Sequence, residues 1–112
     1  MKKGIEIIEN LGARGYKVKG LNSGKVNTIS KEQLIKLVGK CKIVNSIEGE
    51  DIELFATDIE AFDEGFDVNI TKYVIEEESD KVKYIEMDEY FKTYKRLAPA
   101  EKYAKKMFEE LN

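Results

Sequence analysis

The chain has 112 residues, with 22 acidic and 19 basic side chains, no His and a single Cys. This length predicts one domain, and one Cys excludes an internal disulfide. Without His, every mechanism that uses an imidazole as base, relay or ligand is excluded. No apolar run approaches the ~20 residues of a membrane span, so we expect a cytoplasmic protein without a membrane partner.

The charges are sorted along the chain. Residues 1–46 hold ten Lys or Arg against three acids, residues 47–80 hold thirteen acids against one Lys, and the last third is nearly balanced. Two opposed fields of this size steer partners of opposite sign to different surfaces, provided that they stay apart in the fold. The alternative is that the two blocks pair with each other, inside one molecule or between copies in a homo-oligomer.

The first thirty residues predict a hairpin after an ambiguous segment. Lys3–Asn10 fits a short helix, although Ile5–Ile8 fits a strand equally well. Tyr16–Lys19 and Val26–Ile29 are β-like runs on either side of the turn-forming residues 22–24, and this pattern is typical of a hairpin.

A helix and a second hairpin are predicted next. Ser30 and Gln33 match a capping box, in which each side chain satisfies a backbone donor of the other residue, and the helix should run to Gly39. After it, Lys42–Ile47 and Ile52–Ala56 read as two strands joined by an acidic turn.

Residues 57–67 fit a short helix or an acidic loop that is held by its aromatic side chains. A third hairpin is predicted from Val68–Glu76 and Lys81–Met87, which flank a polar turn.

The C-terminal quarter predicts two helices, one capped by Asp88 and one with Pro99 in its first turn. Its many aromatic side chains serve the core or, alternatively, an interface with a partner. The predicted fold is therefore a single α+β domain over residues 1–112, with a mostly antiparallel sheet of about three β-hairpins, one central helix and two C-terminal helices.

The acidic segment 48–67 predicts a protein-binding surface, because carboxylates in sequence can imitate the phosphates that a basic groove binds. Its spacing does not fit a calcium loop, since the sixth position counted from Asp58 is Asp63 where glycine is required. We therefore expect no metal and no cofactor. The predicted partner-binding residues are Glu50, Asp51, Glu53, Asp58, Glu60, Asp63, Glu64 and Asp67.

The basic segment 14–42 supports the alternative of a nucleic-acid-binding accessory protein or regulator, in which lysines contact phosphates and a tyrosine stacks on a base. Only one residue of this set is Arg, and the chain is acidic as a whole, which is unusual for a nucleic-acid binder. The residues of this alternative are Arg14, Tyr16, Lys17, Lys19, Lys25, Lys40 and Lys42.

Cys41 is the one candidate nucleophile with an unusual setting, because Lys40 and Lys42 flank it and cations lower a thiol pKa. The alternative is a half-buried structural residue at a junction between a helix and a strand. No glycine pattern matches a phosphate-binding loop. We therefore predict a non-enzymatic binding protein with no catalytic residues.

One Pro, no Trp, no His and abundant Lys, Glu and Ile give the chain a distinctive composition. In composition and size the whole chain resembles small accessory and inhibitor proteins of low-GC Gram-positive phages and mobile elements. The resemblance rests on no motif, and it implies an accessory or inhibitory role through binding to another protein.

Overall fold

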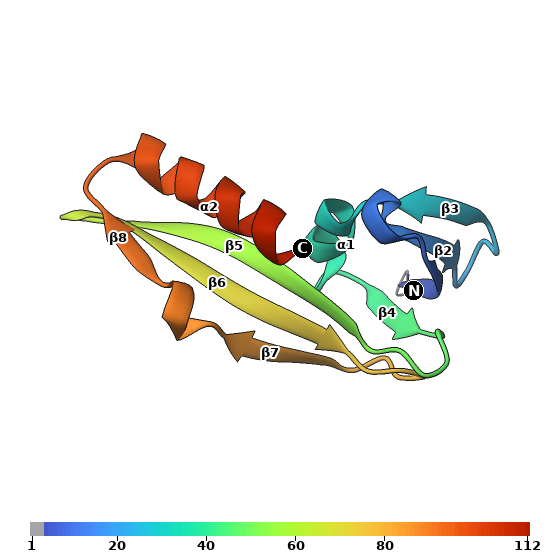
Figure 1. Ribbon diagram of the computed structural model, residues 1–112. Helices are drawn as coiled ribbons and strands as arrows, with labels where there is room; N and C mark the ends of the chain where they lie inside the picture. Colours follow the sequence, from blue (N-terminus) through green and yellow to red (C-terminus); the bar gives the residue numbers. More distant parts are fainter. Residues whose placement is uncertain (1–3) are drawn as a thin grey trace. The chain divides into compact units, whose positions relative to one another are not determined.

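The structure, a computed structural model, describes residues 4–112 and has an α+β fold (Figure 1). Within these residues, eight strands form two mostly antiparallel sheets, accompanied by two α-helices and two short 3-10 helices. The strands are β1 (Gly4–Asn10), β2 (Tyr16–Gly20), β3 (Val26–Ile29), β4 (Lys42–Asn45), β5 (Ile52–Phe62), β6 (Gly65–Ile75), β7 (Val82–Glu86) and β8 (Lys92–Tyr94). The helices are α1 (Lys31–Leu37), α2 (Leu97–Leu111), η1 (Gly12–Arg14) and η2 (Asp88–Tyr90).

The chain forms two compact units. Unit 1 contains the described residues up to Glu53 together with Val74–Lys83, and unit 2 contains Leu54–Tyr73 together with Tyr84–Asn112. Strands β5, β6 and β7 cross the boundary between the units. The acidic segment 48–67 is therefore divided, with its first part in unit 1 and its larger part in unit 2.

Unit 1 is built on a four-stranded sheet with the order β3-β2-β1-β4. The predicted hairpin is confirmed as β2 and β3, which pair antiparallel. The predicted capping box is confirmed at the start of α1. Ser30 Oγ accepts a hydrogen bond of 3.1 Å from the Gln33 amide, and Gln33 Oε1 accepts one of 2.8 Å from the Ser30 amide.

Two expectations for the N-terminal half are corrected. Residues 4–10 of the ambiguous first segment form strand β1 and not a helix, while Lys3 lies outside the described residues. The predicted hairpin of Lys42–Ile47 with Ile52–Ala56 is wrong, because β4 pairs in parallel with β1 and β5 belongs to the other sheet. A parallel pairing needs a crossover between its strands, and here the β2–β3 hairpin and α1 provide it.

The buried amide of Asn45, the last residue of β4, links three backbone segments of unit 1. Its Nδ2 donates hydrogen bonds to the backbone oxygens of Glu50 at 2.8 Å and Ile75 at 3.1 Å. Its Oδ1 accepts one of 3.0 Å from the Ile47 amide. The Asn45 side chain is fully buried, and its one amide satisfies three backbone groups, of which the Ile75 oxygen is buried. The buried apolar residues of unit 1 are Ile7, Tyr16, Val18, Leu34, Ile43, Ile52 and Ile75.

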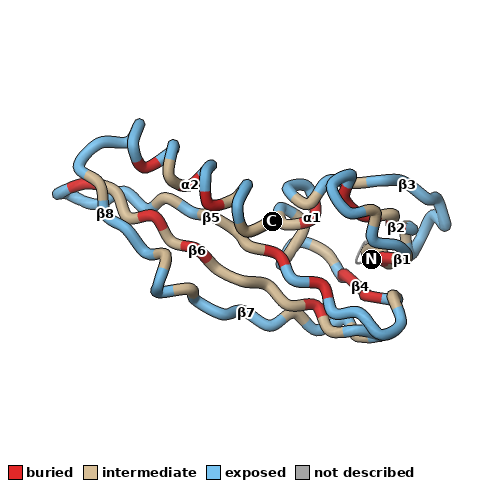
Figure 2. Tube along the Cα trace, viewed as in Figure 1, coloured by how far each residue is buried: buried red, intermediate tan, exposed pale blue. Residues whose placement is uncertain are grey.

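Unit 2 is built from β5, β6, the end of β7, β8 and α2. Helix α2 packs on the sheet through Ala100 and Ala104, which form a buried cluster with Val68 of β6. Small side chains at these two positions let the helix approach the strand closely. Tyr103 donates a hydrogen bond of 2.8 Å from its hydroxyl to the backbone oxygen of Tyr90. Figure 2 shows the buried stretches of α2 and β6.

The sequence misassigns two segments of this unit. Residues 57–67 form parts of β5 and β6 and the turn between them, and not a short helix or an acidic loop. The helix predicted after Asp88 is also wrong, since that segment forms η2 and the short strand β8, which pairs with β6. Pro99 lies in the first turn of α2 as predicted.

The α+β class and the mostly antiparallel pairing are confirmed, and so is the hairpin of β6 and β7 (Figure 1). The finer description, with about three hairpins, one central helix and two C-terminal helices, is wrong. A single domain over residues 1–112 stays a prediction.

We predict that Asn45→Ala destabilises the protein by on the order of 3 kcal/mol, because a buried donor or acceptor left without a partner costs about 1–3 kcal/mol. Urea unfolding followed by circular dichroism measures this loss. Asn27→Ala, at an exposed position on β3, is the matched control and should change the stability by less than about 0.5 kcal/mol. Equal stability of the two variants would contradict the role of the Asn45 amide.

Candidate partner-binding surface

In unit 2, the period-two alternation of strands separates an apolar face from a polar one. Phe66 and Val68 of β6 pack with α2, and Ile59 of β5 packs against the same cluster. Since neighbouring side chains of a strand point to opposite faces, the residues between them project away from the helix. We call this side the open face. It carries Asp58 and Glu60 from β5 and Asp67, Asn69 and Thr71 from β6.

A cavity of about 260 Å³ lies on the open face. Four carboxylates from β5, β7 and η2 line it, together with an amide, a hydroxyl and three apolar side chains, and no Lys or Arg of residues 4–112 is among its lining residues. We call it the acidic cavity. Its lining residues are Asp58, Glu60, Asn69, Ile70, Thr71, Glu86, Met87, Asp88 and Phe91.

Aromatic rings border the carboxylates of the open face. Tyr73 and Tyr84 meet edge to face, with ring centroids 5.1 Å apart and ring planes at 78°. Burial raises the pKa of Tyr73, and the neighbouring Tyr84 and Asp58 raise it further. By the alternation of their strands, Asp58 and Tyr73 both belong to the open face. Tyr84 is 59% exposed and Phe91 46% exposed, so both rings are accessible to a partner.

Asp67 of β6 belongs to the open face but has an internal partner. It lies opposite Thr93 of β8 in the antiparallel register, and its Oδ1 accepts a hydrogen bond of 2.8 Å from the Thr93 hydroxyl. This contact fixes the orientation of the carboxylate, and its second oxygen is still able to accept from a partner.

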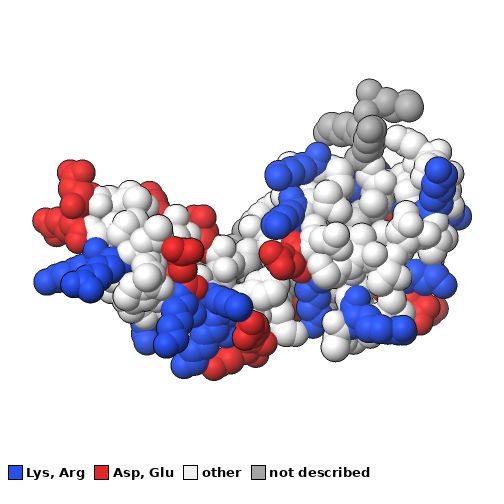
Figure 3. All heavy atoms as spheres, turned by 90° about the horizontal axis from the view of Figure 1, so that it is seen from above, with Lys and Arg blue, Asp and Glu red and all other residues white. Residues whose placement is uncertain are grey.

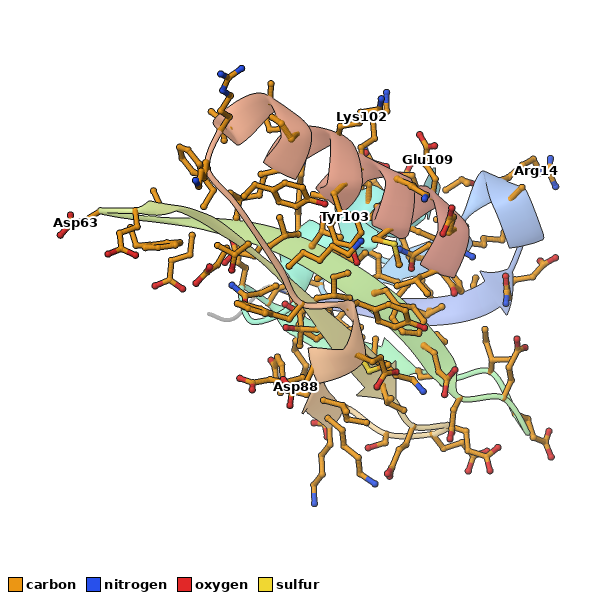
Figure 4. The ribbon with its side chains drawn as sticks, turned by 60° about the vertical axis from the view of Figure 1, so that its left-hand side comes forward. Arg14, Asp63, Asp88, Lys102, Tyr103 and Glu109 are labelled. Carbon is orange, nitrogen blue, oxygen red and sulfur yellow. The ribbon has the colours of Figure 1, made fainter. Side chains whose placement is uncertain are left out.

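The other predicted partner-binding residues lie elsewhere. Asp63 and Glu64 form the exposed turn between β5 and β6, and Figure 4 shows Asp63 at the tip of this turn, well away from Asp88. Glu50 accepts a hydrogen bond of 2.9 Å from the Asn10 side chain in unit 1. The structure therefore brings together only part of the predicted set.

Two further acids of the predicted partner-binding set, Asp51 and Glu53, lie in unit 1. Asp51 accepts a hydrogen bond of 2.9 Å from the Glu77 amide, which fastens the loop before β5. Glu53 is an exposed residue of β5. Neither residue lines the acidic cavity.

In the nucleic-acid alternative, the tyrosine is less accessible than binding to a base requires, and acidic residues lie opposite two of the lysines. Tyr16 is only 3% exposed, so its ring is not accessible for stacking on a base. Lys17 and Lys19 lie directly opposite Glu9 and Glu6 in the β1–β2 register. Facing positions of this kind place opposite charges close together and weaken the positive field of the hairpin.

Lys42 extends this pattern, because it forms an ion pair of 3.5 Å with Asp80, a residue of the acidic block. The three basic residues left from the prediction are Arg14 in η1, Lys25 in the turn between β2 and β3, and Lys40 after α1, all of which are exposed. Within unit 1, then, the basic and acidic blocks partly interleave.

Cys41 lies half-buried at the junction of α1 and β4, in the structural setting that the sequence offers as one alternative. Burial raises the pKa of its thiol, so the flanking lysines do not activate it. The thiol lines a largely apolar cavity of about 560 Å³ in unit 1, together with Ile5, Leu37 and Lys40 among others. A raised pKa disfavours the thiolate and argues against a nucleophilic role.

The side of unit 2 that bears α2 has a different charge pattern from the open face. Basic and acidic side chains lie next to one another there (Figure 3). Lys106 and Glu110 form an ion pair of 3.9 Å along the helix, and the Lys92 ammonium lies 4.6 Å from the centre of the Tyr103 ring. Opposite charges cancel on this side, whereas acids dominate the acidic cavity.

Sequence reasoning missed Glu86 and Asp88, which come from the nearly balanced last third of the chain. It also missed Asn69 and Thr71, which follow the predicted Asp67 at alternate positions, between the apolar residues 66, 68 and 70. That alternation is the signal of a strand with one exposed polar face, and it was available in the sequence.

Within residues 4–112, no group of three or more His, Cys, Asp or Glu side chains is arranged to hold a metal ion. Among the same residues, no helix is long and apolar enough to cross a membrane. No protein-family model matches the chain, and no curated protein or solved structure matches it significantly. A function therefore has to be inferred from the geometry.

We predict that Asp58→Asn lowers the pKa of Tyr73, because removing a nearby carboxylate removes a charge that disfavours the phenolate. The measurement is an alkaline titration of the tyrosine ring carbons by NMR. Asp63→Asn, at the tip of the β5–β6 turn, is the control and should leave the pKa of Tyr73 unchanged. Identical titrations of Tyr73 in wild type and Asp58→Asn would show that the two side chains are not neighbours on the open face.

Proposed function

We propose that this protein binds another protein, and that the open face of unit 2 receives a cationic surface of this partner. The observation that carries the proposal is the acidic cavity, in which four carboxylates gather beside accessible aromatic rings. A positive group brought by a partner would be attracted by several carboxylates at one cavity.

The chemistry of the cavity favours arginine or lysine as the group that it receives. A guanidinium can bind a carboxylate with two parallel hydrogen bonds and can also stack on an aromatic ring. Phe91 lines the cavity, and the exposed Tyr84 borders the same face. Carboxylates beside accessible tyrosine and phenylalanine rings are thus complementary to an arginine-bearing surface.

By binding such a partner, the protein would act as an accessory or inhibitory factor. A basic groove that normally binds phosphates, as in a nucleic-acid enzyme, is one surface that these carboxylates would fit. The charge of the open face and the small size of the protein support this role. The nucleic-acid alternative has less support, because Tyr16 is buried and Lys17 and Lys19 lie opposite carboxylates.

A charge-neutral variant of the cavity tests the proposal. We predict that Asp58→Asn, Glu60→Gln, Glu86→Gln and Asp88→Asn together weaken binding of a synthetic arginine-rich peptide by about tenfold or more, because exposed ion pairs contribute about 0–1 kcal/mol each and the four contributions add. Isothermal titration calorimetry at low salt measures the two affinities.

The control removes the same number of charges from exposed acids elsewhere, through Glu32→Gln, Glu48→Gln, Glu101→Gln and Glu109→Gln. It should change the affinity by less than about threefold, since these acids do not line the acidic cavity and contribute only a longer-range attraction that salt screens. Equal losses of affinity in the two variants would show that net charge, and not the acidic cavity, determines binding of the peptide. Binding of duplex DNA with a steep salt dependence, and no binding of the peptide, would favour the nucleic-acid alternative instead.

A further inference from the structure

Strand β7 is an edge of its sheet beside the acidic cavity. The strand order is β5-β6-β7, and β8 pairs with β6 and not with β7. Four of the five residues of β7 are exposed, including Tyr84 at 59% and Ile85 at 44% (Figure 2). Exposed edges with apolar side chains are unusual, because their backbone groups offer a template for another strand.

The hydrogen bonds of β6 determine which backbone groups of this edge point outward. The Met87 amide donates a bond of 2.9 Å to the Ile70 oxygen, so Met87 faces β6. Backbone groups alternate in direction along a strand, and Ile85 therefore also faces β6, while Tyr84 and Glu86 direct their N–H and C=O groups away from the sheet. The face-to-edge contact of Tyr84 with Tyr73 on β6 fits this register.

The same alternation aligns this edge with the acidic cavity. Glu86 lines the cavity, and Tyr84 lies two residues before it on the same face of the strand. Ile85 projects to the opposite face. An added strand would thus place every second side chain beside Tyr84, Glu86 and the neighbouring carboxylates, and the intervening ones beside Ile85.

Two of the other edge strands, β5 and β3, fit such a partner less well. On β5, the side chain of Asn112 already pairs with the backbone of Phe55, accepting a hydrogen bond of 2.9 Å and donating one of 2.8 Å. Beside the edge strand β3, the exposed Lys25 repels a positively charged segment, whereas the basic residue of β7, Lys83, forms an ion pair with Glu76.

We propose that the partner contributes an extended segment that pairs with the free edge of β7, with basic side chains at alternate positions and apolar side chains between them. The backbone hydrogen bonds of Tyr84 and Glu86 supply affinity, and the acidic cavity selects arginine or lysine on one face of the segment. This inference rests on the proposed function, to which it adds the mode of binding.

Two peptides separate the mode of binding from the charge of the surface. The first is a seven-residue peptide that alternates arginine and valine. The second peptide has the same sequence, but every second backbone amide is N-methylated. The methylated amides are those that would face β7, so they cannot donate hydrogen bonds to it. We expect the first peptide to bind about tenfold or more tightly than the second by fluorescence anisotropy, because strand addition depends on main-chain hydrogen bonds. Equal binding of both peptides would overturn strand addition and leave the proposed function standing, whereas no binding of either would overturn both.

Variants of Tyr84 test the same edge from the side of the protein. Proline at this position removes an outward N–H and no bond to β6, which an edge strand tolerates. We expect Tyr84→Pro to bind the unmethylated peptide about tenfold more weakly than Tyr84→Ala, which loses the same ring but keeps the N–H. Equal affinity of the two variants, both folded by circular dichroism, would contradict the proposal.

Hydrogen exchange gives a readout that does not depend on any substitution. In the free protein, the outward amides of Tyr84 and Glu86 should exchange quickly, and those of Ile85 and Met87 slowly. Added peptide should slow the exchange of Tyr84 and Glu86. Binding of the peptide without protection of these two amides would overturn strand addition.

Discussion

The packing of α2 on one face of β5 and β6 is the constraint on which unit 2 depends. Ala100 and Ala104 present so little volume that the helix lies directly against Val68, and Ile59 and Phe66 complete this apolar contact. Once these side chains are committed to the helix, the strict alternation of a strand sends their neighbours to the other side. The packing of the core therefore determines that the carboxylates of β5 and β6 lie on the open face.

Local signals in the sequence predicted the elements that depend on local chemistry. The capping box at Ser30, the hairpins of β2 with β3 and of β6 with β7, and the place of Pro99 in α2 follow from neighbouring residues alone. Pairing between distant segments is a different matter. Nothing in residues 42–47 specifies β1 as a parallel partner. The apolar residues of the segment 57–67 also fit a helix, although they belong to the end of β5 and the start of β6.

The candidate site likewise combines residues that the sequence predicted with residues that only the pairing of distant segments brings together. The acidic block of the sequence pointed to Asp58, Glu60 and Asp67. These residues lie on one face because side chains alternate along their strands. It did not predict that Glu50 and Asp51 take part in hydrogen bonds within unit 1, or that Glu86 and Asp88 join the acidic cavity from a nearly neutral part of the chain. Burial of Tyr16 and the facing of Lys17 and Lys19 with Glu9 and Glu6 likewise depend on contacts between strands, which composition does not encode.

The central claim is that the open face of unit 2, and not the basic hairpin of unit 1, is the binding surface of the protein. A two-dimensional NMR titration of the ¹⁵N-labelled protein tests it most directly, with a short arginine-rich peptide added in one series and duplex DNA in the other. The account predicts that the peptide shifts the amide signals of Asp58, Glu60, Glu86 and Asp88 and leaves those of residues 14–42 in place. Signals that move mainly in residues 14–42, upon addition of DNA and not of the peptide, would contradict it.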